Sequence, residues 1–164
     1  MSYLVIIRGP LGIGKSTIAK KLAEDIGGEY ISIDEVLTQN NLDKVDEKEG
    51  CIPLINFLKV NKLIFPKINL SIKNRTSVVV DGNFYHEDQV KDLSSSFPSN
   101  NYIFTLTAPL EVCIQRDSQR PRPYGIDATT VVYNLVSRFN YGKVIDVSLK
   151  SVEETVVLII SSLA

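Results

Sequence analysis

Cysteine and histidine are scarce in this chain of 164 residues, which contains two cysteines, one histidine and no tryptophan. Cys51, Cys113 and His86 are too few for a four-ligand zinc site, and two cysteines do not make a disulfide framework. We therefore expect a protein of a reducing compartment, with the cytoplasm as its location.

Long hydrophobic runs and an excess of either charge are also missing. The most apolar stretch, residues 156–160, is far shorter than the roughly 18 residues that a membrane-spanning helix needs. Residues 1–3 lack the basic region that opens a secretory signal. Eighteen Lys and Arg against nineteen Asp and Glu give a net charge of −1, so no global positive field favours nucleic acid. These absences predict a soluble protein with no membrane partner.

The length and the hydrophobic content fit one globular domain over residues 1–164. Hydrophobic residues make up 44% of the chain and charged residues 23%, close to the averages for soluble proteins. Short β-branched runs predict strands at residues 3–7, 30–33, 78–80, 102–106 and 144–147. Helical spacing of apolar residues covers 16–26, 52–72, 87–95, 109–118, 129–139 and 152–163, with Pro66 as a break or kink. This alternation predicts an α/β fold of three layers, with a five-stranded parallel sheet between helices.

Residues 9–17 match the pattern G-x-x-x-x-G-K-[ST], which binds nucleotide phosphates. The segment follows a predicted buried strand and opens a predicted helix. Its glycines let backbone N–H groups approach a phosphate closely, and the helix N-terminus adds partial positive charge. The pattern places Lys15 on the β and γ phosphates and the Ser16 hydroxyl on Mg²⁺. The predicted ATP site consists of Gly9, Gly12, Ile13, Gly14, Lys15, Ser16 and Thr17.

Two aspartates follow predicted strands, and ligands of parallel sheets gather at those strand ends. Asp34 comes after the strand at 30–33, where a carboxylate can take the proton from an attacking hydroxyl. Asp34 also fits a helix N-cap, and the two roles are compatible. Asp81 ends the strand at 78–80, where it can hold Mg²⁺ or simply form a turn with Gly82. The sequence favours Asp34 as the base and Asp81 as the metal ligand. It leaves open the reverse assignment of these two roles.

Three arginines lie within seven residues at the end of a predicted helix: Arg116, Arg120 and Arg122. Guanidinium groups stabilise the charge that spreads over a transferring phosphoryl group when a loop closes over it. We therefore predict a lid at about residues 116–127, with Arg116 and Arg120 as catalytic residues and Arg116 also in contact with ATP. The alternative is an exposed turn whose charges are solvated.

Together these motifs resemble those of small P-loop kinases. The residues that carry the resemblance are 9–17, Asp34, Asp81-Gly82, and Thr107-Ala108-Pro109 followed by Arg116-x-x-x-Arg120. The pattern is most similar to the 5′-hydroxyl polynucleotide kinase domain of bacteriophage type, whose relatives include chloramphenicol phosphotransferases and zeta-toxin-like kinases. The similarity covers most of the chain outside about 37–76. It implies ATP with Mg²⁺, Asp34 as general base, and Arg116 and Arg120 on the transferring phosphate.

The phosphoryl acceptor is less well specified than the reaction. In that family a basic residue usually follows the aspartate, whereas residues 36–39 here are Val, Leu, Thr and Gln. A small molecule therefore ranks first as acceptor, a nucleoside or nucleotide second, and a nucleic-acid 5′ end third. We expect the acceptor pocket along the middle section and residues 83–85, and adenine near residues 146–149. The alternative class is a non-catalytic or slowly hydrolysing ATP-binding regulatory module.

Overall fold

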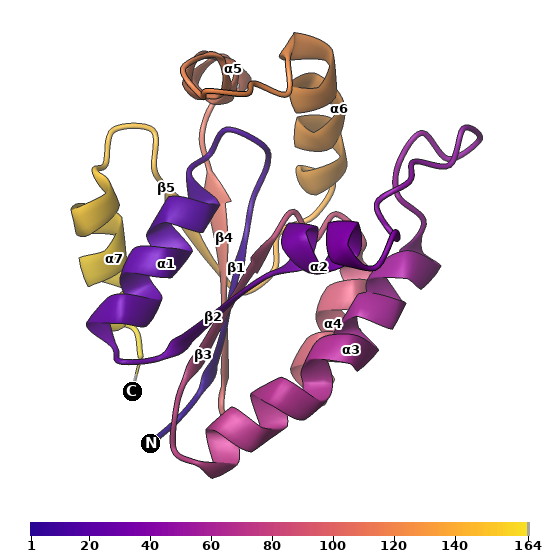
Figure 1. Cartoon of the computed structure of the whole chain (residues 1–164). Coiled ribbons are helices and arrows are strands. Elements are labelled where there is room, and N and C mark those ends of the chain that lie inside the picture. Colours follow the sequence, from indigo (N-terminus) through magenta and orange to yellow (C-terminus); the bar gives the residue numbers. More distant parts are fainter. Residues whose placement is uncertain (164) are drawn as a thin grey trace.

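A parallel sheet forms the centre of the molecule, which a computed structural model describes over residues 1–163. Its strands are β1 (Leu4–Arg8), β2 (Glu29–Ser32), β3 (Val78–Gly82), β4 (Asn101–Thr107) and β5 (Lys143–Asp146). Within the described residues these five strands lie in the order β2-β3-β1-β4-β5, and every neighbouring pair is parallel (Figure 1). The predicted α/β fold with a five-stranded parallel sheet is confirmed.

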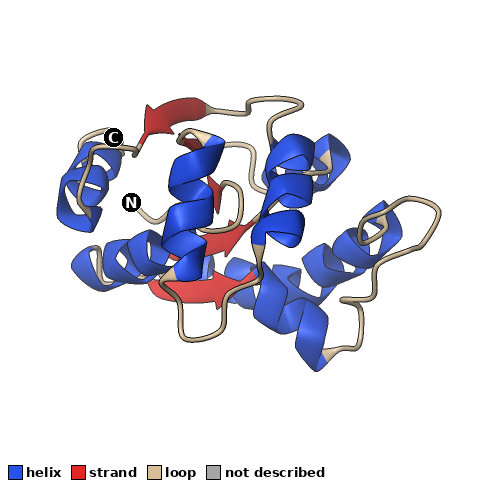
Figure 2. Cartoon of the chain, turned by 90° about the horizontal axis from the view of Figure 1, so that it is seen from above, coloured by secondary structure: helices blue, strands red, loops and turns tan. Residues whose placement is uncertain are grey.

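Helices cover both faces of this sheet. They are α1 (Lys15–Asp25), α2 (Ile33–Gln39), α3 (Leu54–Lys73), α4 (Glu87–Ser95), α5 (Leu110–Ser118), α6 (Ile126–Val136) and α7 (Val152–Ile160). Helices α1 and α7 lie against one face and α2, α3 and α4 against the other (Figure 1), and the view from above shows helices on both sides of the strands (Figure 2). Helices α5 and α6 stand beyond the carboxyl ends of the strands, on the side where the loop after β1 lies (Figure 1).

The central strand β1 is buried on both faces, which explains its continuous apolar sequence. Val5 and Ile7 pack into the core beneath α1 and α7. Leu4 and Ile6 pack into the core on the opposite face. The carboxyl end of β1, and with it the loop of residues 9–14, is therefore held firmly at the middle of the sheet.

The start of α2 differs from the sequence prediction and moves Asp34 from a strand end into a helix. Ser32 is the N-cap residue, and its hydroxyl accepts a hydrogen bond from the Glu35 N–H at 3.3 Å. The strand therefore ends at Ser32, and Asp34 lies in the first turn of α2, where the helix dipole favours a carboxylate. The prediction of Asp34 as an N-cap is wrong because Ser32 already fills that position.

Two prolines and the start of one helix also differ from the sequence prediction. Helix α3 continues through Pro66, so this residue does not end it. Pro109 is the N-cap of α5 and not a residue of its first turn. Helix α6 begins at Ile126, three residues before the predicted start. Over residues 1–163, no helix has both the length and the apolar character that crossing a membrane requires.

Candidate active site

The loop of residues 9–14 joins β1 to α1 and packs tightly against its surroundings. Gly12 and Gly14 have φ values of 76° and 92°, which side chains other than glycine rarely tolerate. A Cβ atom on Gly12 would lie 2.2 Å from the carbonyl oxygen of Cys113, so the loop rests directly on α5. Gly14 is the N-cap of α1, and within the described chain no side chain caps this helix. The first N–H groups of α1 are thus left for a ligand, as an anion site at a helix N-terminus requires.

Lys15, the first residue of α1, is buried next to this loop. Its Nζ donates to the carbonyl oxygen of Pro10 at 3.2 Å. Burial lowers the pKa of the Lys15 ammonium, and the nearby carboxylates of Asp34 and Asp81 act in the opposite direction. A desolvated cation with no ion-pair partner within 4 Å among the described residues would gain from an anionic ligand.

A hollow of about 280 Å³ lies over the loop, and we call it the phosphate hollow. Its walls are Gly12, Gly14, Lys15, Ser16, Thr17, Arg116 and Arg120. The fold thus brings the predicted loop residues together with two of the three predicted lid arginines. Two other predicted loop residues act through packing: Ile13 is buried in the core, and a Cβ on Gly9 would lie 3.3 Å from the carbonyl oxygen of Leu106.

Asp81 is joined to the loop by a short chain of hydrogen bonds. The Ser16 hydroxyl donates to Asp81 Oδ2 at 2.7 Å, and the Tyr30 hydroxyl donates to Oδ1 at 2.8 Å. Burial and the Asp81 carboxylate together raise the pKa of Tyr30. Sequence reasoning missed Tyr30, because the pairing of β2 with β3 that brings it within reach of Asp81 appears only in the assembled sheet.

The pair Ser16 and Asp81 fits a magnesium ion in its donor chemistry. Mg²⁺ prefers hard oxygen ligands and is usually held by one or two protein groups together with phosphates and water. The described residues include no cluster of three or more His, Cys, Asp or Glu that would form an all-protein cage. The hydroxyl and the carboxylate therefore suit a metal that arrives with a nucleotide.

Asp34 stands between the loop and a larger cavity. Burial raises the pKa of the Asp34 carboxyl, and the Lys15 ammonium opposes that shift. The cavity has a volume of about 480 Å³, and Leu11 of the loop and Asp34 of α2 both belong to its wall. We call it the apolar cavity. Its remaining walls are Leu37, Thr38, residues of the 43–52 segment, Asn83, Tyr85, Tyr124 and one face of α6.

The 43–52 segment is fastened to the residues that follow β3. The Ile52 N–H donates to the Tyr85 hydroxyl at 3.0 Å, and His86 Nε2 donates to the Ile52 carbonyl oxygen at 2.8 Å. Asn83 and Tyr85 line the apolar cavity, as predicted. Phe84 does not, because its side chain is fully buried in the core, and its φ of 47° lies in the left-handed region.

The predicted lid arginines have different surroundings. The Arg116 guanidinium donates to the carbonyl oxygens of Ile13, Val147 and Ser148 at 3.3, 2.9 and 3.4 Å. It therefore ties the loop to the segment after β5. Arg120 is exposed, lies 4.6 Å from the Tyr124 ring centroid, and approaches Asp117 at 3.9 Å. Arg122 is exposed in the same turn.

Asp117 fixes the turn that carries Arg120, a role that sequence reasoning missed. Its side chain is buried and accepts the N–H groups of Tyr124 and Gly125 at 3.1 and 2.9 Å. These bonds close residues 118–125 into a defined loop and set the start of α6 at Ile126. An acidic residue among basic neighbours was the available signal, but it equally suits a solvated surface.

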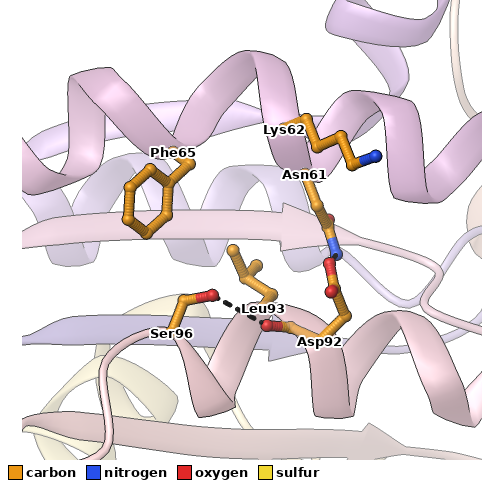
Figure 3. A pocket seen from close by; sticks show the side chains of 6 residues that line it. All are labelled: Asn61, Lys62, Phe65, Asp92, Leu93 and Ser96. Atoms are coloured by element: carbon orange, nitrogen blue, oxygen red, sulfur yellow. Dashed lines mark hydrogen bonds between the residues drawn. The ribbon is translucent and has the colours of Figure 1, made fainter.

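Two further hollows differ in their relation to the loop. One of about 270 Å³ lies beside the phosphate hollow, with Ile13, Thr17, Arg116 and Val147 in its wall, and it includes the region predicted for adenine. The other, of about 180 Å³, lies between α3 and α4 (Figure 3). There Asn61 Nδ2 donates to Asp92 Oδ2 at 2.9 Å, and among the described residues none of the wall belongs to the loop. We assign the second hollow to helix packing.

Comparison with known sequences agrees with this geometry. Residues 4–138 match a family described as an AAA domain. The chain belongs to the AAA domain family. A cytidylate kinase of Ignicoccus hospitalis is 30% identical to this AAA domain protein over 138 residues, which make up 82% of the chain and 73% of that kinase. The family match over residues 4–138 spans the loop, both aspartates and the predicted lid arginines.

Solved structures share the fold of this AAA domain protein. A gluconokinase from Sinorhizobium meliloti superposes with a TM-score of 0.72 at 20% identity, over 94% of this chain and 87% of that one. A sugar kinase from a Janibacter species gives a TM-score of 0.77 at 18% identity, over 98% and 94%. The fold is that of an ATP-binding P-loop NTPase, and the resemblance to P-loop kinases is confirmed at this level. The narrower similarity to polynucleotide kinases and their relatives stays a prediction.

Proposed function

We propose that this protein is an ATP-dependent kinase that transfers the γ-phosphoryl group to a hydroxyl of a small molecule. The observation that carries the proposal is the place of Asp34, which lines the apolar cavity and is close enough to Lys15 for each charge to shift the pKa of the other. A carboxylate between a phosphate loop and a cavity suits a general base. Kinase relatives support phosphoryl transfer in general.

The phosphate hollow supplies the groups that neutralise charge. Lys15 and the first N–H groups of α1 face the β and γ phosphates, and Arg120 covers them from the turn that Asp117 fixes. Ser16 and Asp81 would hold Mg²⁺, which when bound shields the phosphate oxygens. Arg116 positions the loop through its three carbonyl contacts. Residues 118–125 and the adjoining helix ends then act as the lid.

Asp34 performs the proton transfer in this proposal. The acceptor oxygen forms a bond to the γ phosphorus, the bond to the β–γ bridging oxygen breaks, and ADP leaves. The acceptor proton passes to the Asp34 carboxylate, whose raised pKa makes it a stronger base. A phosphate acceptor needs no such base, since it is already ionised at neutral pH, and the carboxylate would repel it. This contrast favours a hydroxyl acceptor over the phosphorylated nucleotide named for the cytidylate kinase.

The test compares Asp34→Asn with Glu35→Gln, because Glu35 is the next residue of α2 and is exposed. Loss of the base should lower kcat by about 10² to 10⁴-fold and leave ATP affinity, measured by calorimetry, nearly unchanged. Glu35→Gln should retain wild-type turnover. A large loss of ATP affinity in Asp34→Asn, or an equal loss of turnover in both variants, would contradict the assignment.

The kinase and the regulatory alternative differ in whether turnover of ATP depends on an acceptor. Radiolabelled ATP and a panel of hydroxyl compounds should give a labelled product with at least one acceptor. If ATP binds but shows only background hydrolysis across the panel, the ATP-binding regulatory module becomes the better reading.

A further inference from the structure

The apolar cavity differs from the phosphate hollow in charge, and this difference defines its ligand. We infer that the acceptor is a hydroxyl compound with a large apolar part and no negative charge, and that Asn83 accepts a hydrogen bond from it. The inference rests on the proposed function, because it takes the apolar cavity as the acceptor site.

Carboxylates are the charged groups of the cavity wall. Asp34, Asp43 and Asp127 line it, and no lysine or arginine does so among the described residues. The nearby arginines belong to the phosphate hollow, where Arg116 and Arg120 meet the loop. An anionic acceptor would therefore lose its hydration and meet negative charge, whereas a neutral or cationic acceptor would not.

Hydrophobic side chains form much of the cavity wall. One face of α6 contributes Val131, Val132 and Leu135, and α2 and the 43–52 segment contribute Leu37 and Ile52. Tyr124 and Val45 also belong to the wall, and they remain 50% and 60% exposed. Burying such side chains under a ligand stabilises the complex in proportion to the apolar area removed from water.

The volume of the cavity fits a small molecule. About 480 Å³ lies within the range of roughly 300–1,000 Å³ found for small-molecule sites. The cavity reaches the phosphate loop at Leu11 and the proposed base at Asp34, so an occupant can present a hydroxyl at that end. The remainder of the molecule would then lie along α6.

Asn83 supplies a polar contact that the free protein leaves unused. It follows β3 directly, lines the cavity and is only 8% exposed. Its Oδ1 atom has no hydrogen-bond partner within the described chain. Oδ1 is buried in the free protein, so the Asn83 amide must turn toward the cavity to meet a ligand donor, and the cost of the unpartnered oxygen favours that turn. The phosphoryl acceptor therefore carries an N–H or a second O–H group besides its reacting hydroxyl.

The test uses three matched probes that share a phenyl ring and a benzylic hydroxyl. They are 1-phenyl-1,2-ethanediol, which is neutral, 2-amino-1-phenylethanol, which is cationic, and mandelate, which is anionic. Their Kd values are measured by ligand-observed NMR on the full chain with Mg²⁺ and a non-hydrolysable ATP analogue. The diol and the amino alcohol should bind about tenfold more tightly than mandelate, the effect of one poorly screened charge contact. Equal or tighter binding of mandelate, or no binding of any probe, would overturn the inference.

Charge variants at exposed positions give a matched control. Asp127→Lys places a cation on the cavity wall and should reverse or erase the discrimination against mandelate. Asp88→Lys makes the same change in the first turn of α4, outside the cavity wall, and should leave all three Kd values unchanged. An equal response in both variants would show a long-range charge effect and contradict a site in this cavity.

The role of Asn83 is tested with Asn83→Leu. This variant should weaken the diol and the amino alcohol by about fivefold to tenfold, the usual effect of one lost hydrogen bond, while keeping its affinity for the ATP analogue. Unchanged probe affinity would refute the role of Asn83. These experiments measure binding and not turnover. The cavity assignment and the kinase proposal can therefore be contradicted independently. If the charge order holds but ATP gives no phosphorylated probe or other acceptor, the kinase proposal fails and the cavity assignment stands.

Discussion

Asp34 shows how burial, more than any neighbouring charge, can tune a single residue. Its carboxyl lies in the first turn of α2, where the helix dipole and Lys15 favour the charged form, yet burial outweighs both and raises its pKa. A buried carboxylate with an incomplete counter-charge costs stability whenever it is ionised. The same feature that suits a base therefore weakens the fold at neutral pH.

Because the ionised Asp34 carboxylate costs stability, Asp34→Asn should raise the free energy of unfolding, and the gain should depend on pH. A group whose pKa is raised on folding contributes stability that is complete below its unfolded pKa of about 3.8 and is lost as pH rises through the folded pKa. The variant should therefore unfold at higher urea concentration than wild type at pH 7, and the difference should shrink as the pH approaches 4. Glu35→Gln, at an exposed position, is the control. A destabilised Asp34→Asn at pH 7 would mean that attraction to Lys15 dominates.

Arg8 acts at the scale of elements, because it joins β1 to the end of α6. Its guanidinium donates to the carbonyl oxygens of Val136 and Phe139, both at 2.9 Å, and lies 4.2 Å from the Phe139 ring centroid. It also bonds the Thr105 hydroxyl at 3.1 Å and the Phe84 carbonyl oxygen at 3.4 Å. The last carbonyls of a helix have no partner within it and favour a cation. Burial lowers the pKa of Arg8 to about 10, so it stays charged at neutral pH.

Replacing Arg8 should loosen this junction. Arg8→Met leaves several buried carbonyl oxygens without donors and should lower the free energy of unfolding by about 3 kcal/mol. Arg138→Met removes an exposed arginine just after α6 and should change it by less than about 0.5 kcal/mol. Urea denaturation measures both. Similar values for the two variants would show that Arg8 does not hold α6 in place.

At the scale of the whole molecule, the proposed ligands lie where separate layers meet. The phosphate hollow is formed by the loop after β1, the start of α1 and the end of α5, and the apolar cavity by α2, α6 and four connecting segments. A ligand in either place contacts parts of the chain that are far apart in sequence. Binding should therefore stabilise the fold as a unit.

Nucleotide binding should be visible in thermal unfolding. A non-hydrolysable ATP analogue with Mg²⁺ at about 100 times its Kd should stabilise the protein by about 2.7 kcal/mol and raise Tm by about 5–10 °C. Lys15→Ala should lose most of this shift, because it removes the buried cation of the phosphate hollow. Lys21→Ala, on the exposed side of α1, should keep it. If Lys15→Ala kept the full rise in Tm, Lys15 would not belong to the nucleotide site.

Local sequence predicts much of the fold and the phosphate-loop half of the candidate site. The strands at Leu4–Arg8 and Val78–Gly82 are continuous apolar runs, and the glycines of the loop need conformations that few residues adopt. The errors arose where a neighbouring group decided the outcome. Ser32 took the cap position expected for Asp34, and Asp117 moved the start of α6 through two backbone hydrogen bonds. Ser32 and Glu35 form the S-x-x-E pattern that marks a helix start, a signal that the sequence prediction did not use, whereas the Asp117 contacts follow no such pattern.

The sequence by itself determined the phosphate loop, the strand–helix alternation and hence the parallel sheet, because each depends on residues within about one turn or one strand of each other. Only the tertiary structure decided the apolar cavity and the surroundings of Asn83. The walls of that cavity come from residues 11, 34–52, 83–85 and 124–135, which meet only after the sheet has assembled. Carboxylates, apolar surface and the Asn83 amide form the proposed acceptor site only where packing brings them around one cavity.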